Sequence, residues 1–208
     1  MKLIHISDTH GQHHHLVIPN GKIIAHTGDF TNRGTELQVD MFLNWYASLP
    51  HQHKLLIAGN HDFYAQHYPH EMRQKCHILG ITYLCDSSAT IEGIKFYGTP
   101  YVPIFYDWAF MESERLLTEI YANIPDDTQV LLTHGPALFC LDEVPRGNVG
   151  SSALADRLEL LPQLTHHLCG HIHESRGKHR GRYLTSNASC VDKWYNPLPP
   201  QSMYIKPN

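Results

Sequence analysis

The stretch Thr27-Gly28-Asp29-Phe30-Thr31-Asn32-Arg33-Gly34 guides the interpretation of the whole chain. It follows an apolar run, Ile23-Ile24-Ala25, that is typical of a buried strand. The strand ends at a glycine and an acid, and the chain then turns through polar residues. In open α/β sheets, ligands bind outside the carboxyl ends of the strands, so Asp29 stands where a functional site is expected. A carboxylate has two oxygens, and Asp29 can therefore bridge two cations.

The composition favours a globular protein that does not bind nucleic acid polymers. The chain has 208 residues, 42% of them hydrophobic, and a net charge of −4 with neutral histidine. This length is enough for one substantial core, and we expect a single domain spanning residues 1–208. The negative charge argues against the broad basic face that a general nucleic-acid binder needs.

Cysteine usage and hydropathy favour a cytoplasmic location. The five cysteines are irregularly spaced and form no C-x-x-C pair, which favours reduced thiols over a disulfide framework or a zinc ribbon. Residues 1–7 lead into a strand without a secretory apolar region. No run approaches the roughly 18 apolar residues that a membrane span needs, so no membrane partner is expected. The oligomeric state stays open.

Alternation of strands and helices in the first third of the chain predicts a parallel sheet with helical crossovers. We expect strands over 3–7, 22–26 and 54–58, with a helix over 34–49 between the second and the third. Four apolar residues of that helix recur every four positions and are expected to face the core, with Phe42 and Tyr46 widening the face. They are Leu37, Met41, Trp45 and Leu49.

The remaining elements are shorter, and with the first sheet they predict two sheets flanked by helices. Strands are expected over 82–84, 90–91, 94–97, 129–133 and 165–169, a turn at Glu92-Gly93, helices over 111–124 and 151–161, and short strands from 182 onward. An aromatic loop occupies 100–110, and two interpretations of it stay open. In one interpretation the loop stacks on a nucleobase of the substrate, and in the other it forms a satellite hydrophobic cluster.

Five strand ends carry side chains that can bind metals. They are Asp8 and His10, Asp29, Asn60 and His61, His134, and His171 and His173. Two of these sets are i, i+2 pairs, whose side chains point the same way in extended backbone. Mixed imidazole, carboxylate and amide ligands suit Mn, Fe, Co, Ni or Zn, and the absence of cysteine argues against a structural zinc site. One such motif alone is more often a turn or a helix cap, but five in order predict a metal site.

The five blocks resemble the complete signature of the calcineurin-like metallophosphoesterases. They are Asp8-Thr9-His10, Gly28-Asp29, Gly59-Asn60-His61-Asp62, Thr133-His134-Gly135 and Gly170-His171-Ile172-His173. The short chain, the aromatic loop, Gly135-Pro136 and Gly150-Ser151 resemble the small metallophosphodiesterase branch of that superfamily. The resemblance implies an α/β fold, a four-layer α/β/β/α sandwich of two mixed sheets flanked by helices, with a dinuclear metal centre.

The resemblance also implies a role for each position. Asp29 would bridge the two metals, His61 would lie near the phosphate without binding metal, and Arg33 would bind the phosphate. One metal would be held by Asp8, His10 and His173, and the other by Asn60, His134 and His171. Protein serine/threonine phosphatases of the superfamily carry a supporting aspartate where this chain has Asn32. Asp62 is a candidate for orienting His61, and a solvated side chain is the alternative for Arg33.

These residues predict phosphoester hydrolysis. Two metals about 3.5–4 Å apart can clamp a phosphoryl group and activate a bridging hydroxide. His61 is suited to protonate the leaving alkoxide, and Asn60 to contact the phosphate. We expect two divalent ions, Mn²⁺ first and Fe, Zn, Co or Ni as alternatives, and a small phosphodiester substrate such as a cyclic nucleotide. Alternatives are a phosphomonoesterase, a protein phosphatase, which Asn32 disfavours, and a non-catalytic metal- or phosphate-binding module.

Two other polar clusters are expected to be solvated. His13-His14-His15 could recruit a metal, but a solvated loop is favoured. Four basic residues near the last block are expected in a solvated hairpin. They are Arg176, Lys178, Arg180 and Arg182.

Overall fold

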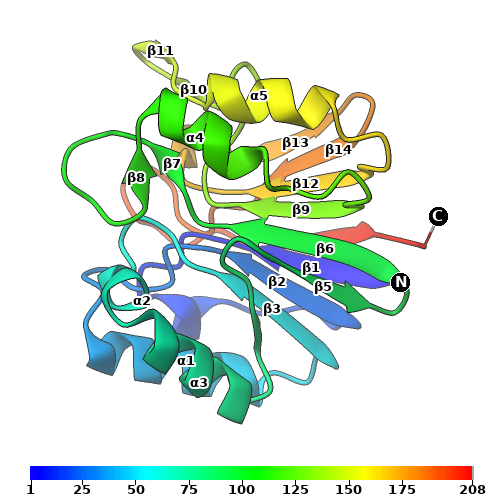
Figure 1. The fold of residues 1–208 in the computed structure, drawn as a ribbon. Coiled ribbons are helices and arrows are strands. Elements are labelled where there is room, and N and C mark those ends of the chain that lie inside the picture. The colour runs from blue at the N-terminus through cyan, green and yellow to red at the C-terminus, as the bar shows by residue number, and fades with distance from the viewer. Residues whose placement is uncertain (208) are drawn as a thin grey trace.

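Two mixed β-sheets pack face to face, with helices on both outer faces (Figure 1). This architecture is seen in a computed structural model, which describes residues 1–207. The layers are helices, first sheet, second sheet and helices, so the expected four-layer α/β/β/α sandwich is confirmed.

The first sheet has the strand order β15-β1-β2-β3-β4. Its strands are β1 (Lys2–Ile6), β2 (Ile23–Thr27), β3 (His53–Ile57), β4 (Thr82–Tyr83) and β15 (Gln201–Tyr204). The first four run parallel, and β15 pairs antiparallel with β1. Along each strand apolar side chains alternate between the two faces. Leu3 and Ala25 therefore face the second sheet, whereas Ile4 and Ile24 face the helices.

Three helices cover the outer face of this sheet: α1 (Glu36–Ser48), α2 (Phe63–His67) and α3 (Pro69–Ile78). The Thr35 hydroxyl caps α1 by accepting from the Gln38 amide. The prediction for the buried face of α1 was wrong in part, because Leu37 and Met41 are 70% and 51% exposed. The buried stripe has i, i+3, i+4, i+7 spacing and consists of Val39, Phe42, Leu43 and Tyr46.

The second sheet has the order β13-β14-β12-β9-β6-β5. Its strands are β5 (Ser87–Ile91), β6 (Ile94–Thr99), β9 (Val130–Thr133), β12 (His166–Cys169), β13 (Gly177–Arg180) and β14 (Leu184–Asn187). The central four run parallel and the two edge strands are antiparallel. The turn at Glu92-Gly93 is confirmed, with φ of 53° and 75°.

Two helices, α4 (Glu114–Tyr121) and α5 (Ser152–Glu159), cover the outer face of the second sheet. The Ser151 hydroxyl caps α5 by accepting from the Leu154 amide. The helix expected over 111–124 begins later, because β8 (Met111–Glu112) pairs with β7 (Val102–Pro103) and Ser113 caps α4.

The small elements are the strands β10 (Glu143–Val144) and β11 (Gly147–Asn148) and the 3₁₀ turns His13–His15 and His173–Ser175.

A polar link crosses the apolar layer between the sheets. His5 on β1 lies 2.9 Å from the Ser186 hydroxyl through Nδ1 and 3.0 Å from the Thr27 hydroxyl through Nε2. Ser7, directly after β1, forms a parallel bridge with Ser189, which follows β14. The carboxyl ends of the parallel strands in both sheets thereby meet at one edge of the sandwich (Figure 1). Within residues 1–207, no helix has the length and apolar character needed to cross a membrane.

Tyr46→Phe is predicted to lower the free energy of unfolding by about 1–3 kcal/mol, because a buried hydrogen bond is lost. The Tyr46 hydroxyl donates to the carbonyls of Leu55 at 2.7 Å and Ile24 at 3.1 Å, and the side chain is fully buried. Urea unfolding measures the change. Tyr68→Phe, at a residue 51% exposed, is the control. Equal stability of the two variants would contradict the role given to the Tyr46 hydroxyl.

Candidate metal centre

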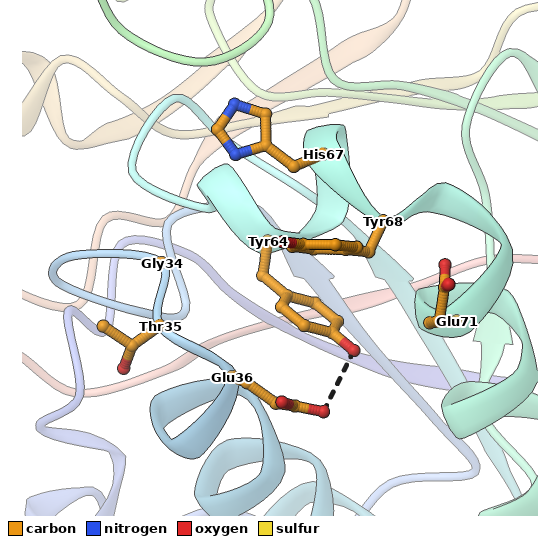
Figure 2. Close-up of a pocket in the computed structure, with 7 residues that line it drawn as sticks. All are labelled: Gly34, Thr35, Glu36, Tyr64, His67, Tyr68 and Glu71. Atoms are coloured by element: carbon orange, nitrogen blue, oxygen red, sulfur yellow. Dashed lines mark hydrogen bonds between the residues drawn. The ribbon is translucent and has the colours of Figure 1, made fainter.

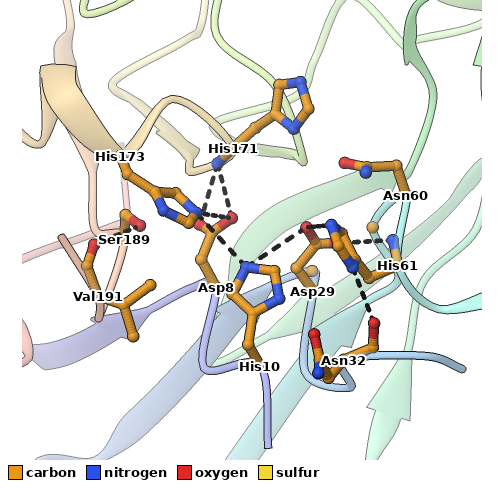
Figure 3. A network of polar contacts seen from close by, with 12 residues as sticks. Asp8, His10, Asp29, Asn32, Asn60, His61, His171, His173, Ser189 and Val191 are labelled. Atoms are coloured by element: carbon orange, nitrogen blue, oxygen red, sulfur yellow. Dashed lines mark hydrogen bonds and ion pairs between the residues drawn. The ribbon is translucent and has the colours of Figure 1, made fainter. Parts of the chain in front are cut away.

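The metal-type side chains expected from the sequence converge where the strand ends meet. Asp8, His10, Asp29, His61 and His173 turn toward one another in Figure 3. Three overlapping groups place their ligand atoms within 4.8 Å of one another. They are Asp8, His10 and His173; His10, Asp29 and His61; and Asp29, His134 and His171. Asp29 therefore lies between two ligand clusters.

The first cluster contains side chains that follow β1 and β12. Nε2 of His173 lies 3.5 Å from Oδ1 of Asp8 and 3.4 Å from Nε2 of His10. Nε2 of His10 is also 3.8 Å from Oδ2 of Asp29. The ligand atoms of Asp8, His10 and His173 are therefore close enough together to bind one metal ion.

The second cluster lies on the other side of Asp29. Nε2 of His134 is 3.4 Å from Oδ2 of Asp29 and 2.9 Å from Oδ1 of Asn60. The His171 ring lies 4.9 Å from the His134 ring, centroid to centroid. One carboxylate oxygen of Asp29 is thus within 4 Å of a histidine nitrogen from each cluster.

The backbone at the site is left-handed at several ligand positions. Asp8, His10, Asp29 and His171 have φ of 51°, 43°, 58° and 69°. The i, i+2 pairs therefore do not lie in extended backbone, contrary to expectation, because β1 ends at Ile6 and β12 at Cys169. The side chains converge because the loops turn back over the strand ends. Strained backbone of this kind concentrates at functional sites.

Glycines allow these loops to approach the carboxylates. A Cβ at Gly170 would overlap with Oδ2 of Asp8, and one at Gly59 would overlap with Oδ1 of Asp29. Because these glycines have no Cβ, the backbone amides of the residues nearby can contact the carboxylates. The His171 amide donates to Asp8 at 2.9 Å, and the His61 amide donates to Asp29 at 2.8 Å.

The centre concentrates negative charge away from solvent. Burial opposes ionisation of Asp8 and Asp29, but His173 and His134 outweigh it and hold the pKa of each carboxyl well below its usual range. Burial likewise opposes a charge on His134, yet Asp29 raises its pKa to about 9. Burial lowers the pKa of His10 to about 4 and of His171 to about 3.

The donor set fits bound cations. Nδ1 of His134 donates to the Thr27 carbonyl at 2.9 Å, so the lone pair of Nε2 faces Asp29 and the Asn60 amide oxygen. Acceptors that face one another in a buried space need a positive charge between them, supplied by a proton or a metal ion. Buried carboxylates surrounded by imidazoles are a donor set for divalent transition metals.

Asp62 does not orient His61, and that expectation was wrong. Its carboxylate accepts bonds from the amides of Gly59, Asp29 and Thr31 at 2.8, 2.9 and 3.0 Å. Burial and the charge of Asp29 raise the pKa of Asp62 to about 7, while these donors act in the opposite direction. Asp62 therefore ties the loop after β2 to the loop after β3, which places Asp29 beside Asn60.

His61 is oriented by a backbone group. Its Nδ1 lies 2.9 Å from the carbonyl oxygen of Asn32, and its Nε2 lies 3.9 Å from Oδ2 of Asp29 (Figure 3). The nitrogen opposite the carbonyl thus faces the centre. Arg33 is exposed next to this carbonyl, and its amide donates to the Gln38 side chain.

Comparison with known proteins identifies the family of this chain. The family model of the calcineurin-like phosphoesterases matches residues 1–175. The chain belongs to this family. It is 33% identical over 226 residues to metallophosphoesterase domain-containing protein 1 of Homo sapiens, covering 96% of this chain and 69% of the human protein. The family supports metal-dependent phosphoester hydrolysis.

Solved structures share the fold. The crystal structure of TT1561 of Thermus thermophilus has a TM-score of 0.66 at 11% identity, covering 90% of this chain and 88% of that chain. Phosphopantetheinyl hydrolase of Mycobacterium tuberculosis has a TM-score of 0.59 at 14% identity, with the same coverage.

Three residues of this calcineurin-like phosphoesterase support the ligand loops from outside. His26, at the end of β2, lies 3.1 Å from the Thr9 hydroxyl and accepts from the Gly28 amide. Asn187, whose role was not anticipated, donates to the Ile172 carbonyl at 2.8 Å. Tyr195 was also missed, and its ring lies 5.0 Å from that of His10 and 5.6 Å from that of His173. Only its place in a Trp-Tyr pair could have drawn attention to it.

The histidine run at 13–15 and the basic residues near the last block were expected to be solvated, but some of their side chains are buried or hydrogen-bonded. His13 is 2% exposed and packs 4.8 Å from the Trp45 ring, whereas His14 and His15 are exposed. Three of the four basic residues near the last block donate to backbone carbonyls. The bonds run from Arg176 to Ser189, from Lys178 to Ser202 and from Arg182 to Leu161. Arg176 and Lys178 thereby tie this hairpin to the C-terminal segment, whereas Arg182 ties it to the chain at the end of α5.

A separate surface groove lies beside α1, α2 and α3 (Figure 2). It is lined by Gly34, Thr35, Glu36, Tyr64, His67, Tyr68 and Glu71. The Tyr64 hydroxyl donates to Glu36 at 3.2 Å. None of the proposed metal ligands lines this groove, and its two glutamates disfavour an anionic phosphate there.

Gly170→Ala is predicted to weaken metal binding by at least about 10-fold, because supporting groups around metal ligands typically carry effects of this size. The new Cβ would overlap with Asp8, so that carboxylate must move. Titration with Mn²⁺, followed by calorimetry, measures the change. Gly181→Ala is the matched control, because its Cβ would meet only Nε2 of His179, at 3.7 Å. Unchanged affinity in Gly170→Ala would contradict the tight packing proposed around Asp8.

Proposed function

We propose that this chain is a dinuclear metal-dependent phosphodiesterase. The carrying observation is that Asp29 belongs to two metal-type groups, one with His10 and His61 and the other with His134 and His171. In this proposal Asp29 would serve as a ligand to both ions. Asp8, His10 and His173 would hold one of them, and Asn60, His134 and His171 would hold the other.

The chain's own residues supply orientation and proton transfer. Two divalent ions bound here would polarise a phosphoryl oxygen and provide a nucleophile at neutral pH. His61, held through Nδ1 by the Asn32 carbonyl, donates the proton on Nε2 to the leaving alkoxide. The Asn60 amide and the Arg33 guanidinium contact the phosphate. Asp62 acts as a positioning residue for the two loops.

A small diester is the preferred substrate class, with a cyclic nucleotide as one example. A diester carries one negative charge, whereas a monoester carries up to two. Arg33 is the single lysine or arginine among the residues proposed for the site, which suits the smaller charge. Monoester hydrolysis and protein dephosphorylation are the alternatives, and non-catalytic binding is a third.

The identity of the metal ion, the cellular location and the domain organisation are part of the same proposal. Manganese is the preferred ion, with Fe, Zn, Co and Ni as alternatives. A cytoplasmic location is supported by the five cysteines, which are all free, three of them buried. Residues 1–208 are proposed to form one domain.

A panel of substrates separates the alternatives. Cyclic nucleotides, linear diesters, monoesters and a phosphopeptide are compared with Mn²⁺ added. Highest kcat/KM on diesters supports the proposal, and highest kcat/KM on a monoester or the phosphopeptide assigns one of the alternatives. Turnover of none of them, with metal bound, favours the non-catalytic module.

The chain is predicted to bind two equivalents of Mn²⁺, and Asp29→Asn to lose both metal content and activity more than any other single ligand change. The physical reason is that a bridging carboxylate serves both ions. Metal analysis after equilibration with Mn²⁺ measures the stoichiometry. Asp156→Asn, at an exposed position on α5, is the control. Saturation at one equivalent in the unmodified chain would rule out the dinuclear centre.

His61→Ala is predicted to lower kcat about 10²–10⁴-fold on a diester with an alkoxide leaving group, the usual contribution of a general acid. The loss should be much smaller with p-nitrophenolate, which departs without a proton. Metal content should be unchanged, because His61 is not a proposed ligand. His70→Ala, at an exposed position, is the control. Equal losses on both substrates would assign His61 a binding role, and lost metal would make it a ligand.

A further inference from the structure

Trp108 covers one face of the His61 ring. The two ring centroids are 4.3 Å apart with an interplanar angle of 32°. Phe63 lies 6.0 Å from the same indole, at 37°. Trp108 belongs to none of the five ligand blocks, and it reaches the site from the loop between β7 and β8.

The loop that carries Trp108 is fixed to the metal centre by its backbone. The amide of Ala109 donates to the carbonyl of Asn60 at 3.1 Å, so the residue after Trp108 is bonded to the residue before His61. Ala109 is fully buried and Phe110 is 3% exposed, and the Phe110 carbonyl accepts from the Val102 amide. These backbone bonds therefore fix the position of the Trp108 indole relative to His61.

The sequence left two interpretations of the aromatic loop open, a stack on a nucleobase and a hydrophobic cluster. The aromatic residues of the loop fall into two groups in the structure. Phe110 joins the hydrophobic core, whereas Phe105 and Tyr106 at the tip are 60% and 78% exposed. Trp108 lies between these groups and contacts the proposed general acid. Its neighbours in the loop therefore serve as controls for its role.

Three contacts restrain the His61 ring. Nδ1 is bonded to the Asn32 carbonyl, the ring makes a T-shaped contact with His10 at 4.6 Å between centroids, and one face meets Trp108. The first contact selects which nitrogen faces the centre. The contact with Trp108 opposes rotation of the ring out of its plane. It is also the one contact that a substitution removes without altering the backbone or a proposed metal ligand.

We propose that Trp108 is a positioning residue for His61: its indole holds the imidazole so that Nε2 faces the leaving group. The inference rests on the proposed function, in which His61 is the general acid. A displaced donor transfers its proton less well, since small misplacements at an active site carry large rate costs. Trp108 should therefore affect only the chemistry that depends on the His61 proton.

The test compares leaving groups in Trp108 variants of the metal-loaded protein. Trp108→Ala should lower kcat about 10-fold or more on a diester with an alkoxide leaving group, and far less with p-nitrophenolate, with KM and metal content little changed. Trp108→Phe should recover most of the loss, because a flat ring remains. Tyr106→Ala, two positions earlier in the same loop, should behave as the unmodified protein.

A double variant separates this inference from the proposed function. In a His61→Ala background, Trp108→Ala should cause no further loss, because the group that it positions is absent. Additive losses, or equal losses on both leaving groups, would overturn the role of Trp108 while leaving His61 as the acid. If His61→Ala itself shows no dependence on the leaving group, the proposed role of His61 fails first.

Discussion

Two buried carboxylates, Asp8 and Asp29, set the condition that the surrounding structure meets. A buried charge costs several kcal/mol unless it is paired or hydrogen-bonded. Here backbone amides of His171 and His61 donate to the carboxylates, and histidines from both sheets surround them. The amide that contacts Asp29 comes from 32 positions away in the chain, and the amide that contacts Asp8 comes from 163 positions away. The site therefore holds the edge of the two sheets together as well as presenting ligands.

The loops achieve this by giving up regular backbone. Left-handed residues cost of order 1–3 kcal/mol each, although Asp and His tolerate this region better than most. The cost is offset by hydrogen bonds from outside the ligand set. Asp62 joins the loops after β2 and β3, His26 holds the loop after β1, and Asn187 holds the loop after β12. Loss of these supports would move ligands without removing any of them.

The strand ends and their ligands could be predicted because each is local. A short apolar run followed by glycine and a polar ligand is visible in sequence, and the family resemblance ordered the five blocks. The packing around them is not local. The buried face of α1 depends on where Thr35 starts the helix, α3 buries only Met72 and Cys76, and Tyr195 reaches His10 from the far end of the chain.

The substitution at Asn32 shows why a motif can depart from its pattern and keep its geometry. The family resemblance implies that an aspartate at this position would support His61 through its side chain. The Asn32 carbonyl accepts from Nδ1 instead, and it belongs to the backbone of a loop that Asp62 and Thr31 fix. Orientation of His61 therefore depends on the shape of the loop rather than on the side chain at position 32. A further constraint on the ring plane is then needed, and Trp108 is placed to provide it.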